Sequence, residues 1–264
     1  MDAITSYRLG ILGVDPAALA DEPLPERLSA AYAAFIREVP FENLSHQRSC
    51  RGAPETPRAW PRATDRMLRE HRVGGTGGTC FSLAYALRDL LQGVGGNAHL
   101  ILGRNLVTEE MHAAVVVFDG PSALLFDPTL LSPSPLPMRT GSTVEDPLGT
   151  IRLVGTCREA LTVMIHKPRD RRAHAAYAIG KRPAHPRSFR RAWIGSFDRG
   201  RRRPLRLARR VGDVIHRYSE CPSRLERLTP GGAERRDLDE APVRALHELF
   251  GIREDYLSEW FART

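Results

Sequence analysis

The first third of the chain alternates hydrophobic and polar positions with the period of an α-helix. Leu28, Ala31, Tyr32, Phe35 and Ile36 recur at i, i+3 and i+4 spacing, so they share one apolar stripe. Pro40 ends this helix, because the residue before a proline is pushed out of the α region. A second stripe begins near Cys80 and ends around Gly93, and it consists of Leu83, Ala84, Leu87, Leu90 and Leu91.

After Gly96 the pattern changes to short apolar runs with turn residues between them. The runs His99–Leu102, Ala113–Phe118 and Ala123–Phe126 have the length of strands, and Asp119-Gly120 is a hairpin signal between the last two. Beyond a proline-rich loop, the runs 150–154 and 160–165 predict a further pair of strands. The middle of the chain is therefore predicted to form an antiparallel sheet or small barrel.

The rest of the chain is less regular. Residues 167–210 carry many arginines with little periodicity and predict no definite element, whereas Ala241 to Phe261 is helical again. A length of 264 residues favours more than one domain. We expect an α+β fold with a helical domain over 1–95 that ends in the Cys80 helix, a β-barrel-like domain over 96–190, and a C-terminal region over 191–264.

The charge of the chain is unusual, with a formal net charge of +8 and arginine as nearly the whole basic content. Such a charge fits an acidic partner, simple solubility, or a bias in codon composition. The stretch Arg199–Arg210 could be solvated surface, or could bind the phosphate of a CoA or an acidic carrier protein. Nucleic acid is the least favoured partner, because only Trp193 and Phe197 lie near these arginines.

Targeting signals are not recognisable in the sequence. The N-terminus lacks a basic segment followed by an apolar core, and no apolar run approaches the roughly 18 residues of a membrane span. None of the four cysteines forms a CxxC pair, and the histidines have no metal-ligand spacing. We therefore expect a cytoplasmic protein without a membrane segment and without a bound metal.

Cys80 is the first candidate for chemistry. It follows a turn containing four glycines, 74–78, and opens the second predicted helix, where backbone N–H groups and the helix dipole stabilise an anion such as a thiolate. A lone cysteine in such a helix is more often a small buried core residue. The position alone does not decide between these two interpretations.

Two downstream residues favour the reactive interpretation. His112 stands at the start of one predicted strand, and Asp127 ends the strand paired with it across the Asp119-Gly120 turn. The two ends of such a hairpin lie side by side, so the carboxylate can orient an imidazole that activates Cys80. The alternatives stay open on spacing alone: His112 could cap a strand, and Asp127, which precedes Pro128, could only start a turn.

These residues stand in a sequence that resembles the arylamine N-acetyltransferase family. The resemblance is carried by Val39-Pro40-Phe41-Glu42-Asn43-Leu44, by Gly77-Gly78-Thr79-Cys80-Phe81, and by His112 and Asp127 in that order. Three further segments resemble the family more weakly: Asp146-Pro147-Leu148, Cys221-Pro222-Ser223 and Leu249-Phe250-Gly251-Ile252.

The resemblance implies a helical bundle, a β-barrel-like middle domain and an α/β third region that covers the site, built around a core like that of cysteine proteases and transglutaminases. It also implies a ping-pong mechanism. A thioester acylates Cys80, His112 moves protons, Asp127 holds the imidazole, and an amine takes the acyl group. The residues expected to contact substrate are Phe41, Gly78, Thr79, Phe81, Pro128 and Thr129.

The implied co-substrate is acetyl-CoA or another acyl thioester, and the implied acceptor is a small amine. The chain departs from the family's Arg-Gly-Gly-x-Cys motif, since the arginine is displaced to Arg72 and Ser82 and Ala84 replace a glutamate and an asparagine. After Asp127 the family's glycine-containing loop is replaced by 128–131. Relatives of this family act as amide synthases fed by carrier proteins, so an acidic acyl carrier protein is an alternative donor for this divergent chain.

Two other functions remain open. Asp127-Pro128-Thr129 and the order Cys, His, Asp also resemble transglutaminase-like cysteine enzymes, which exchange or hydrolyse amides. That family explains the 39–44 segment less well. A basic, non-catalytic binding protein is the third possibility, but it would have no need of Cys80, His112 and Asp127 together.

Overall fold

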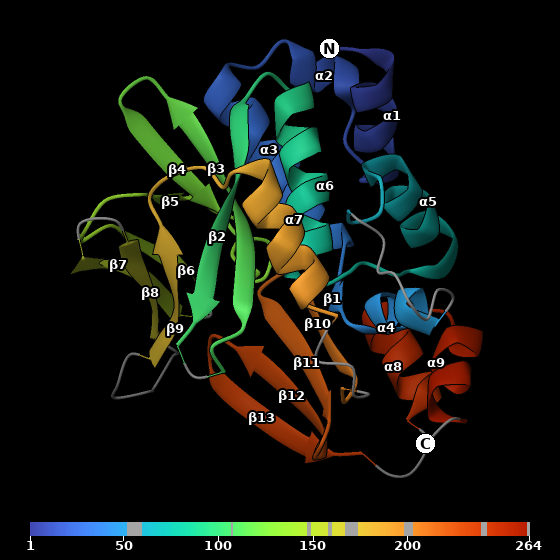
Figure 1. The fold of residues 1–264 in the computed structure, drawn as a ribbon. Coiled ribbons are helices and arrows are strands. Elements are labelled where there is room, and N and C mark those ends of the chain that lie inside the picture. The colour runs from blue at the N-terminus through green and yellow to red at the C-terminus, as the bar shows by residue number, and fades with distance from the viewer. Residues whose placement is uncertain are drawn as a thin grey trace.

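The structure is a computed structural model, and it describes residues 1–51, 60–106, 108–146, 149–157, 160–166, 174–197, 203–238 and 242–262. Helices dominate the first part of the chain, two antiparallel sheets follow, and a helical pair closes the described part (Figure 1). The first helices are α1 (Ala3–Ile11), α2 (Pro16–Ala20), α3 (Leu24–Glu38), α4 (Leu44–Arg51), α5 (Thr64–Gly74) and α6 (Cys80–Gly93). None of the helices in these ranges has the length and apolar character needed to cross a membrane.

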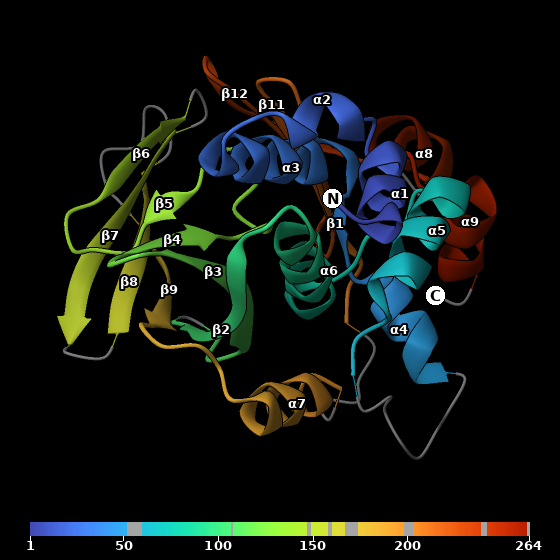
Figure 2. The same cartoon turned by 90° about the horizontal axis from the view of Figure 1, so that it is seen from above.

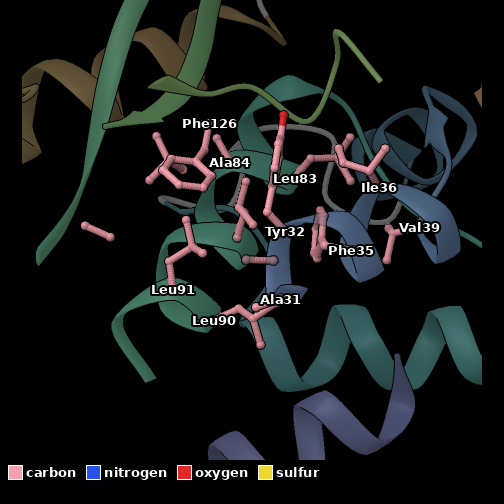
Figure 3. Close-up of a cluster of buried hydrophobic side chains, with 14 of the residues drawn as sticks. Ala31, Tyr32, Phe35, Ile36, Val39, Leu83, Ala84, Leu90, Leu91 and Phe126 are labelled. Carbon is pink, nitrogen blue, oxygen red and sulfur yellow. The ribbon is translucent and has the colours of Figure 1, made fainter. Parts of the chain in front are cut away.

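Both predicted helical stripes are confirmed as core. The stripe of α3 is at most 4% exposed at each of its five predicted positions, and the stripe of α6 is at most 1% exposed. Figure 3 shows Tyr32 and Phe35 of α3 beside Leu83 and Leu90 of α6, with Phe126 closing the cluster. Helix α6 therefore lies at the centre of the molecule, which fixes the position of its first residue, Cys80.

The middle of the chain forms the predicted antiparallel barrel-like sheet. Among the described residues its strand order is β5-β4-β3-β2-β9-β8-β7-β6, with antiparallel pairing throughout. The bounds are β2 (Asn97–Asn105), β3 (Met111–Asp119), β4 (Ser122–Phe126), β5 (Leu136–Pro137), β6 (Thr143–Asp146), β7 (Gly149–Cys157), β8 (Ala160–His166) and β9 (His174–Gly180). The Asp119-Gly120 hairpin is confirmed, and Gly120 has the positive φ of 55° that such a turn requires.

The apolar run of strand β3 is continuous rather than alternating because both faces of this strand are buried. Ala113, Val115 and Val117 face the core around α6, whereas Ala114 and Val116 face a second core inside the curved sheet. A strand buried on both faces reads as an unbroken hydrophobic segment. Figure 2 shows what covers the two faces of β3: α6 lies on one side of β2 and β3, and the remaining barrel strands lie on the other.

The described residues between 174 and 238 contain elements that the sequence did not reveal. Helix α7 (Pro186–Gly195) covers α6, where Phe189 and Trp193 pack on Phe81. A second sheet has the order β1-β10-β11-β12-β13 among the described residues. Its strands are β1 (Phe41–Glu42), β10 (Arg206–Val211), β11 (Val214–Glu220), β12 (Ser223–Thr229) and β13 (Gly232–Asp237).

The C-terminal segment is helical, as predicted, but in two pieces. Helices α8 (Val243–Phe250) and α9 (Glu254–Phe261) are separated at Gly251, whose φ of 72° ends α8 in a left-handed cap. Ala241, where the prediction began, lies outside the described residues. The division of the chain at residues 95 and 190 stays a prediction.

Candidate active site

Cys80 is the first residue of α6 and is half-buried. The turn before it depends on close packing more than on unusual dihedral angles. Only Gly75 in this segment has a positive φ, 67°. A Cβ on Gly77 would overlap the Pro40 carbonyl oxygen, and one on Gly78 would lie 2.7 Å from the Ser82 Cβ. These glycines therefore bring the 39–44 segment against the start of α6.

The 39–44 segment has a structural role at this contact. Phe41 forms a parallel bridge with Gly78, and the Glu42 N–H donates to the Gly78 carbonyl at 3.1 Å. The Asn43 side chain accepts from the Arg206 N–H and donates to the Pro204 carbonyl, both at 2.8 Å. The segment thus joins the Cys80 turn to the second sheet, which was not foreseen from its sequence.

The arginine that holds the turn is Arg62, and not Arg72, the position to which the family's arginine is displaced in this sequence. Arg62 is 8% exposed, donates to the Gly77 carbonyl and pairs with Glu70, and its guanidinium also donates to the Ser45 hydroxyl at 3.0 Å. Arg72 is exposed. Sequence spacing could not reveal this role of Arg62, because Arg62 precedes Gly77 by 15 residues and reaches the turn only through the fold.

His112 and Asp127 meet as the hairpin predicts. Val115 pairs with Phe126 in the register of β3 and β4, so Asp127 follows the last paired residue on the same side as His112. The His112 Nε2 lies 2.7 Å from the Asp127 Oδ2, and Cys80 lies close enough to the imidazole to contribute to the raised pKa of His112. Because Nε2 faces the carboxylate, Nδ1 is the nitrogen left for the thiol.

Asp127 is only 1% exposed, and both of its carboxylate oxygens are engaged. Oδ2 accepts from His112 and from the Tyr177 hydroxyl, while Oδ1 accepts from the Thr129 N–H and hydroxyl, each at 2.8 Å. The Tyr32 hydroxyl donates to the Asp127 backbone carbonyl at 2.8 Å. Asp127 therefore starts a turn and also bonds His112, so the two interpretations left open by the sequence are compatible.

Two supporting residues escaped the sequence analysis. Tyr177 lies in β9, within the stretch whose elements could not be predicted, and Tyr32 had been assigned only to the apolar stripe of α3. Burial, followed by the charge of Asp127, raises the pKa of Tyr177 well above its usual value. Its hydroxyl therefore stays protonated and remains a donor to the carboxylate.

The charges of the site follow from this arrangement. Burial alone would lower the pKa of His112, but the Asp127 carboxylate and hydrogen bonds with Asp127 and Cys80 raise that pKa to about 10. Burial likewise would raise the pKa of Asp127, but His112, Tyr177 and Thr129 hold it below its usual value. The pair is therefore charged near neutral pH, which places an imidazolium beside Cys80.

Two cavities meet at Cys80. The larger, about 720 Å³, is also lined by His112, Thr129 and Tyr177 and extends over the second sheet. The other, about 610 Å³, lies beneath α7 and is lined by Thr79 and Phe81 among other residues. Of the substrate-contact residues predicted from the sequence, Phe41 lines both cavities, Thr129 lines the first, and Thr79 and Phe81 line the second.

The other two predicted substrate contacts, Gly78 and Pro128, are buried and line neither of these two cavities. Within the described ranges, no cluster of three or more histidine, cysteine or acidic side chains could hold a metal ion.

No protein-family model matches the sequence, and no curated protein does. Solved structures, however, match the whole arrangement. The arylamine N-acetyltransferase of Mycobacterium marinum superposes with a TM-score of 0.78 at 19% identity, covering 98% of each chain. That of Salmonella typhimurium gives 0.74 at 18% identity over 100% of each chain.

The arylamine N-acetyltransferase of Bacillus cereus, which has a Cys-His-Glu catalytic triad, gives a TM-score of 0.72 at 18% identity and covers 96% of this chain and 99% of its own. The geometry brings Cys80, His112 and Asp127 together between the N-terminal helices, the barrel-like sheet and the second sheet. The comparisons concern the arrangement of these elements as a whole. This is the fold of the arylamine N-acetyltransferases, and the predicted fold is confirmed.

Proposed function

We propose that this protein is a cysteine-dependent acyltransferase that moves an acyl group from a thioester, through an acyl-enzyme on Cys80, to an amine. One observation carries the proposal: Cys80 lies beside the hydrogen-bonded pair of His112 and Asp127, at the point where two cavities meet. Each cavity gives one reactant access to the same sulfur. The likeness in fold to the arylamine N-acetyltransferases supports the reaction class.

In the first half-reaction the Cys80 thiolate attacks the carbonyl carbon of the thioester. The new bond from Sγ to carbon forms, the bond from carbon to the donor sulfur breaks, and the departing thiolate takes a proton from the His112 imidazolium. His112 is then neutral. Asp127 holds the ring in position throughout, since its carboxylate bonds Nε2 in both protonation states.

In the second half-reaction the amine nitrogen attacks the acyl carbon on Cys80. Neutral His112 accepts the proton that the nitrogen loses, and the bond from carbon to Sγ breaks. The amide leaves, and Cys80 returns to the thiolate paired with the imidazolium. Donor and acceptor thus react in turn with one nucleophile, which is a ping-pong mechanism.

The start of α6 offers donors for the oxyanion of both tetrahedral intermediates. The backbone N–H groups of Cys80 and Phe81 precede the first hydrogen bond of the helix, which Leu83 donates to Thr79 at 3.0 Å. The Thr79 hydroxyl is buried and has no hydrogen-bond partner among the described residues. Thr79 lines the same cavity as Cys80. We assign it to the oxyanion or to the incoming acceptor.

The expected donor and acceptor follow from analogy and from the resemblance to the family. Acetyl-CoA is the expected donor by analogy, since the Mycobacterium marinum enzyme has been solved with CoA bound. An acidic acyl carrier protein is the alternative. The acceptor is a small-molecule amine, and we expect the reaction to take place in the cytoplasm.

The test is a panel of acetyl-CoA, longer acyl-CoAs and acyl carrier proteins, each mixed with the protein and followed by intact mass spectrometry. The expected result is one acyl adduct that maps to Cys80 and is missing in Cys80→Ala. Cys221→Ala is the matched control, because Cys221 is a free, exposed cysteine far along the chain. If none of the donors forms an adduct with the protein, the proposal is wrong.

The second candidate is a transglutaminase-like activity, favoured by the way Thr129 of the Asp127-Pro128-Thr129 segment fixes the carboxylate. An adduct from a glutamine peptide or another amide, without one from thioesters, would establish it. Tight and steeply salt-dependent binding of nucleic acid by Cys80→Ala, with no adduct from any donor, would instead favour a non-catalytic binding protein.

A further inference from the structure

Helix α7 lies at the periphery of the molecule, outside α6 (Figure 2), and presents three different faces. Phe189 and Trp193, four residues apart, pack on Phe81 and hold the helix against α6. Arg187 and Arg190 belong to a second face and are exposed. The third face lies over the cavity beneath α7, the smaller of the two cavities that meet at the nucleophile.

The third face consists of small residues. Ser188, Ala192 and Gly195 follow one another at spacings of four and three, so they share one side of the helix, and all three line the cavity. A Cβ added at Gly195 would meet no atom of a neighbouring segment within 4 Å. These small residues therefore leave space beneath the helix instead of allowing another segment to pack closely against it.

Such a space is unusual, because protein interiors are close-packed and voids larger than a water molecule are few. At about 610 Å³ the cavity lies within the range of roughly 300–1,000 Å³ that holds small-molecule ligands. Ser188 lines the cavity and is exposed, so the cavity opens to solvent along α7. A small molecule can therefore reach the nucleophile from beneath this helix.

The wall of this cavity next to the nucleophile is apolar. It includes Phe41, Phe81, Leu102 and Met111. Phe81 follows Cys80 in the chain and Met111 precedes His112, so two of these side chains adjoin the reacting groups. An acceptor whose nitrogen reaches Cys80 would rest an apolar body on this wall, and removal of that body from water favours its binding.

The charged residues of the lining lie toward solvent. Arg191 and Arg206 are exposed, and Arg203, which is 39% exposed, pairs with Glu110 at 3.1 Å. Among the described residues the lining thus holds three arginines and one carboxylate. This positive excess, together with the His112 imidazolium, repels an alkylammonium ion. The acceptor that fits is therefore an uncharged amine of low basicity, such as one attached to an aromatic ring.

We infer that α7 sets the size of the acceptor: the amine nitrogen lies at Cys80, and an apolar body of more than one ring lies beneath α7, against Ala192 and Gly195. This inference rests on the proposed function and adds to it the shape of the acceptor and the element that selects it. The small residues of α7 are then a specificity determinant, because larger side chains at these positions would occupy the space that the second ring needs.

The experiment compares two amines that differ by one ring, aniline and 4-aminobiphenyl. Acyl-enzyme is prepared with a donor that acylates Cys80, and excess donor is removed. The second-order rate constant for loss of the acyl group is then measured with each amine by rapid quench and intact mass. We expect 4-aminobiphenyl to react at least about tenfold faster with the wild type, because burial of a ring of this size favours binding by about one to two orders of magnitude.

Gly195→Leu should bring the ratio of the two rate constants close to one, whereas Gly195→Ala should lower it only slightly. Gly10→Leu is the matched control. Gly10 also lies near the end of a helix, and a Cβ there also meets no neighbouring atom within 4 Å, but Gly10 does not line the cavity. It should keep the wild-type ratio. Because the ratio compares two amines within one variant, a general loss of folding does not change it.

The outcomes separate this inference from the proposed function, with hydrazine as a third and smaller acceptor. If none of the three removes the acyl group from wild-type Cys80, the proposed function fails. If hydrazine removes it and neither arylamine does, or if both arylamines react at the same rate, acyl transfer stands and the inference about α7 is wrong. A preference for 4-aminobiphenyl that survives in Gly195→Leu would place the second ring elsewhere and would also overturn the inference.

Discussion

The surroundings of Asp127 and of Cys80 differ in how completely their polar atoms are engaged. Asp127 is buried, and both carboxylate oxygens accept hydrogen bonds from side chains or backbone. Cys80 is half-buried between two cavities, and the neighbouring Thr79 hydroxyl has no partner among the described residues. One end of the triad is fixed by the protein, and the other keeps its donors for a reactant.

This difference shows what each end contributes. A fully hydrogen-bonded carboxylate holds the imidazole in one orientation and keeps it protonated. A hydrogen-bond donor beside the nucleophile that has no partner in the folded protein stabilises the oxyanion only when the oxyanion forms during the reaction. Variants at the fixed end should therefore affect both stability and rate, whereas variants at the open end should affect rate alone.

Asp127→Asn should have the largest effect. It removes the charge that balances His112, so we expect acyl transfer to slow by about 10³ to 10⁴-fold and the free energy of unfolding to fall by about 3 kcal/mol. Steady-state kinetics and urea unfolding measure the two quantities. Asp119→Asn, at the exposed end of the same hairpin, is the control and should change neither. A normal rate in Asp127→Asn would rule out the triad.

Thr79→Val should lower kcat by about tenfold or more, because it removes one donor to the oxyanion. The free energy of unfolding should stay the same, since no hydrogen bond within the described residues is lost. Thr79→Ser keeps the hydroxyl and should restore most of the rate. If Val and Ser behave alike, the hydroxyl has no part in the reaction.

Tyr177→Phe should slow the reaction by roughly tenfold, the value of one hydrogen bond to a charged group. Tyr32→Phe is the matched comparison, because its hydroxyl bonds only the backbone carbonyl of Asp127. It should cost about 1 kcal/mol of stability with a smaller loss of rate. Equal losses of rate in the two variants would show that Tyr177 acts through packing alone.

The pH dependence of stability tests the charge on His112. Its pKa in the folded protein, about 10, lies above the unfolded value of 6.5, so its stabilising effect is complete below pH 6.5. The effect is lost as the pH rises from 6.5 to about 10. The difference in unfolding free energy between the wild type and His112→Gln should shrink over that interval. A constant difference would mean that His112 is neutral when folded.

Local patterns predicted much of this structure. The stripes of α3 and α6, the 119–120 hairpin and the pairing of β7 with β8 all follow from short-range periodicity, and the meeting of His112 and Asp127 follows from the hairpin register. The contacts that cross the fold did not follow. Arg62 reaches the Cys80 turn, Tyr177 reaches Asp127, and Phe41 joins a sheet formed some 160 residues later. Such contacts leave no periodic signal, because each depends on the packing of distant elements.

The most direct test of the central claim is a two-step experiment on the wild type. The protein is first mixed with an acyl thioester in the absence of amine, and the acyl group is located by peptide mapping. An amine is then added, and the loss of the adduct and the gain of amide are followed together. The account predicts about one acyl group per protein, on Cys80, transferred quantitatively to the amine. Amide formation without a Cys80 adduct, or in Cys80→Ala, would contradict it.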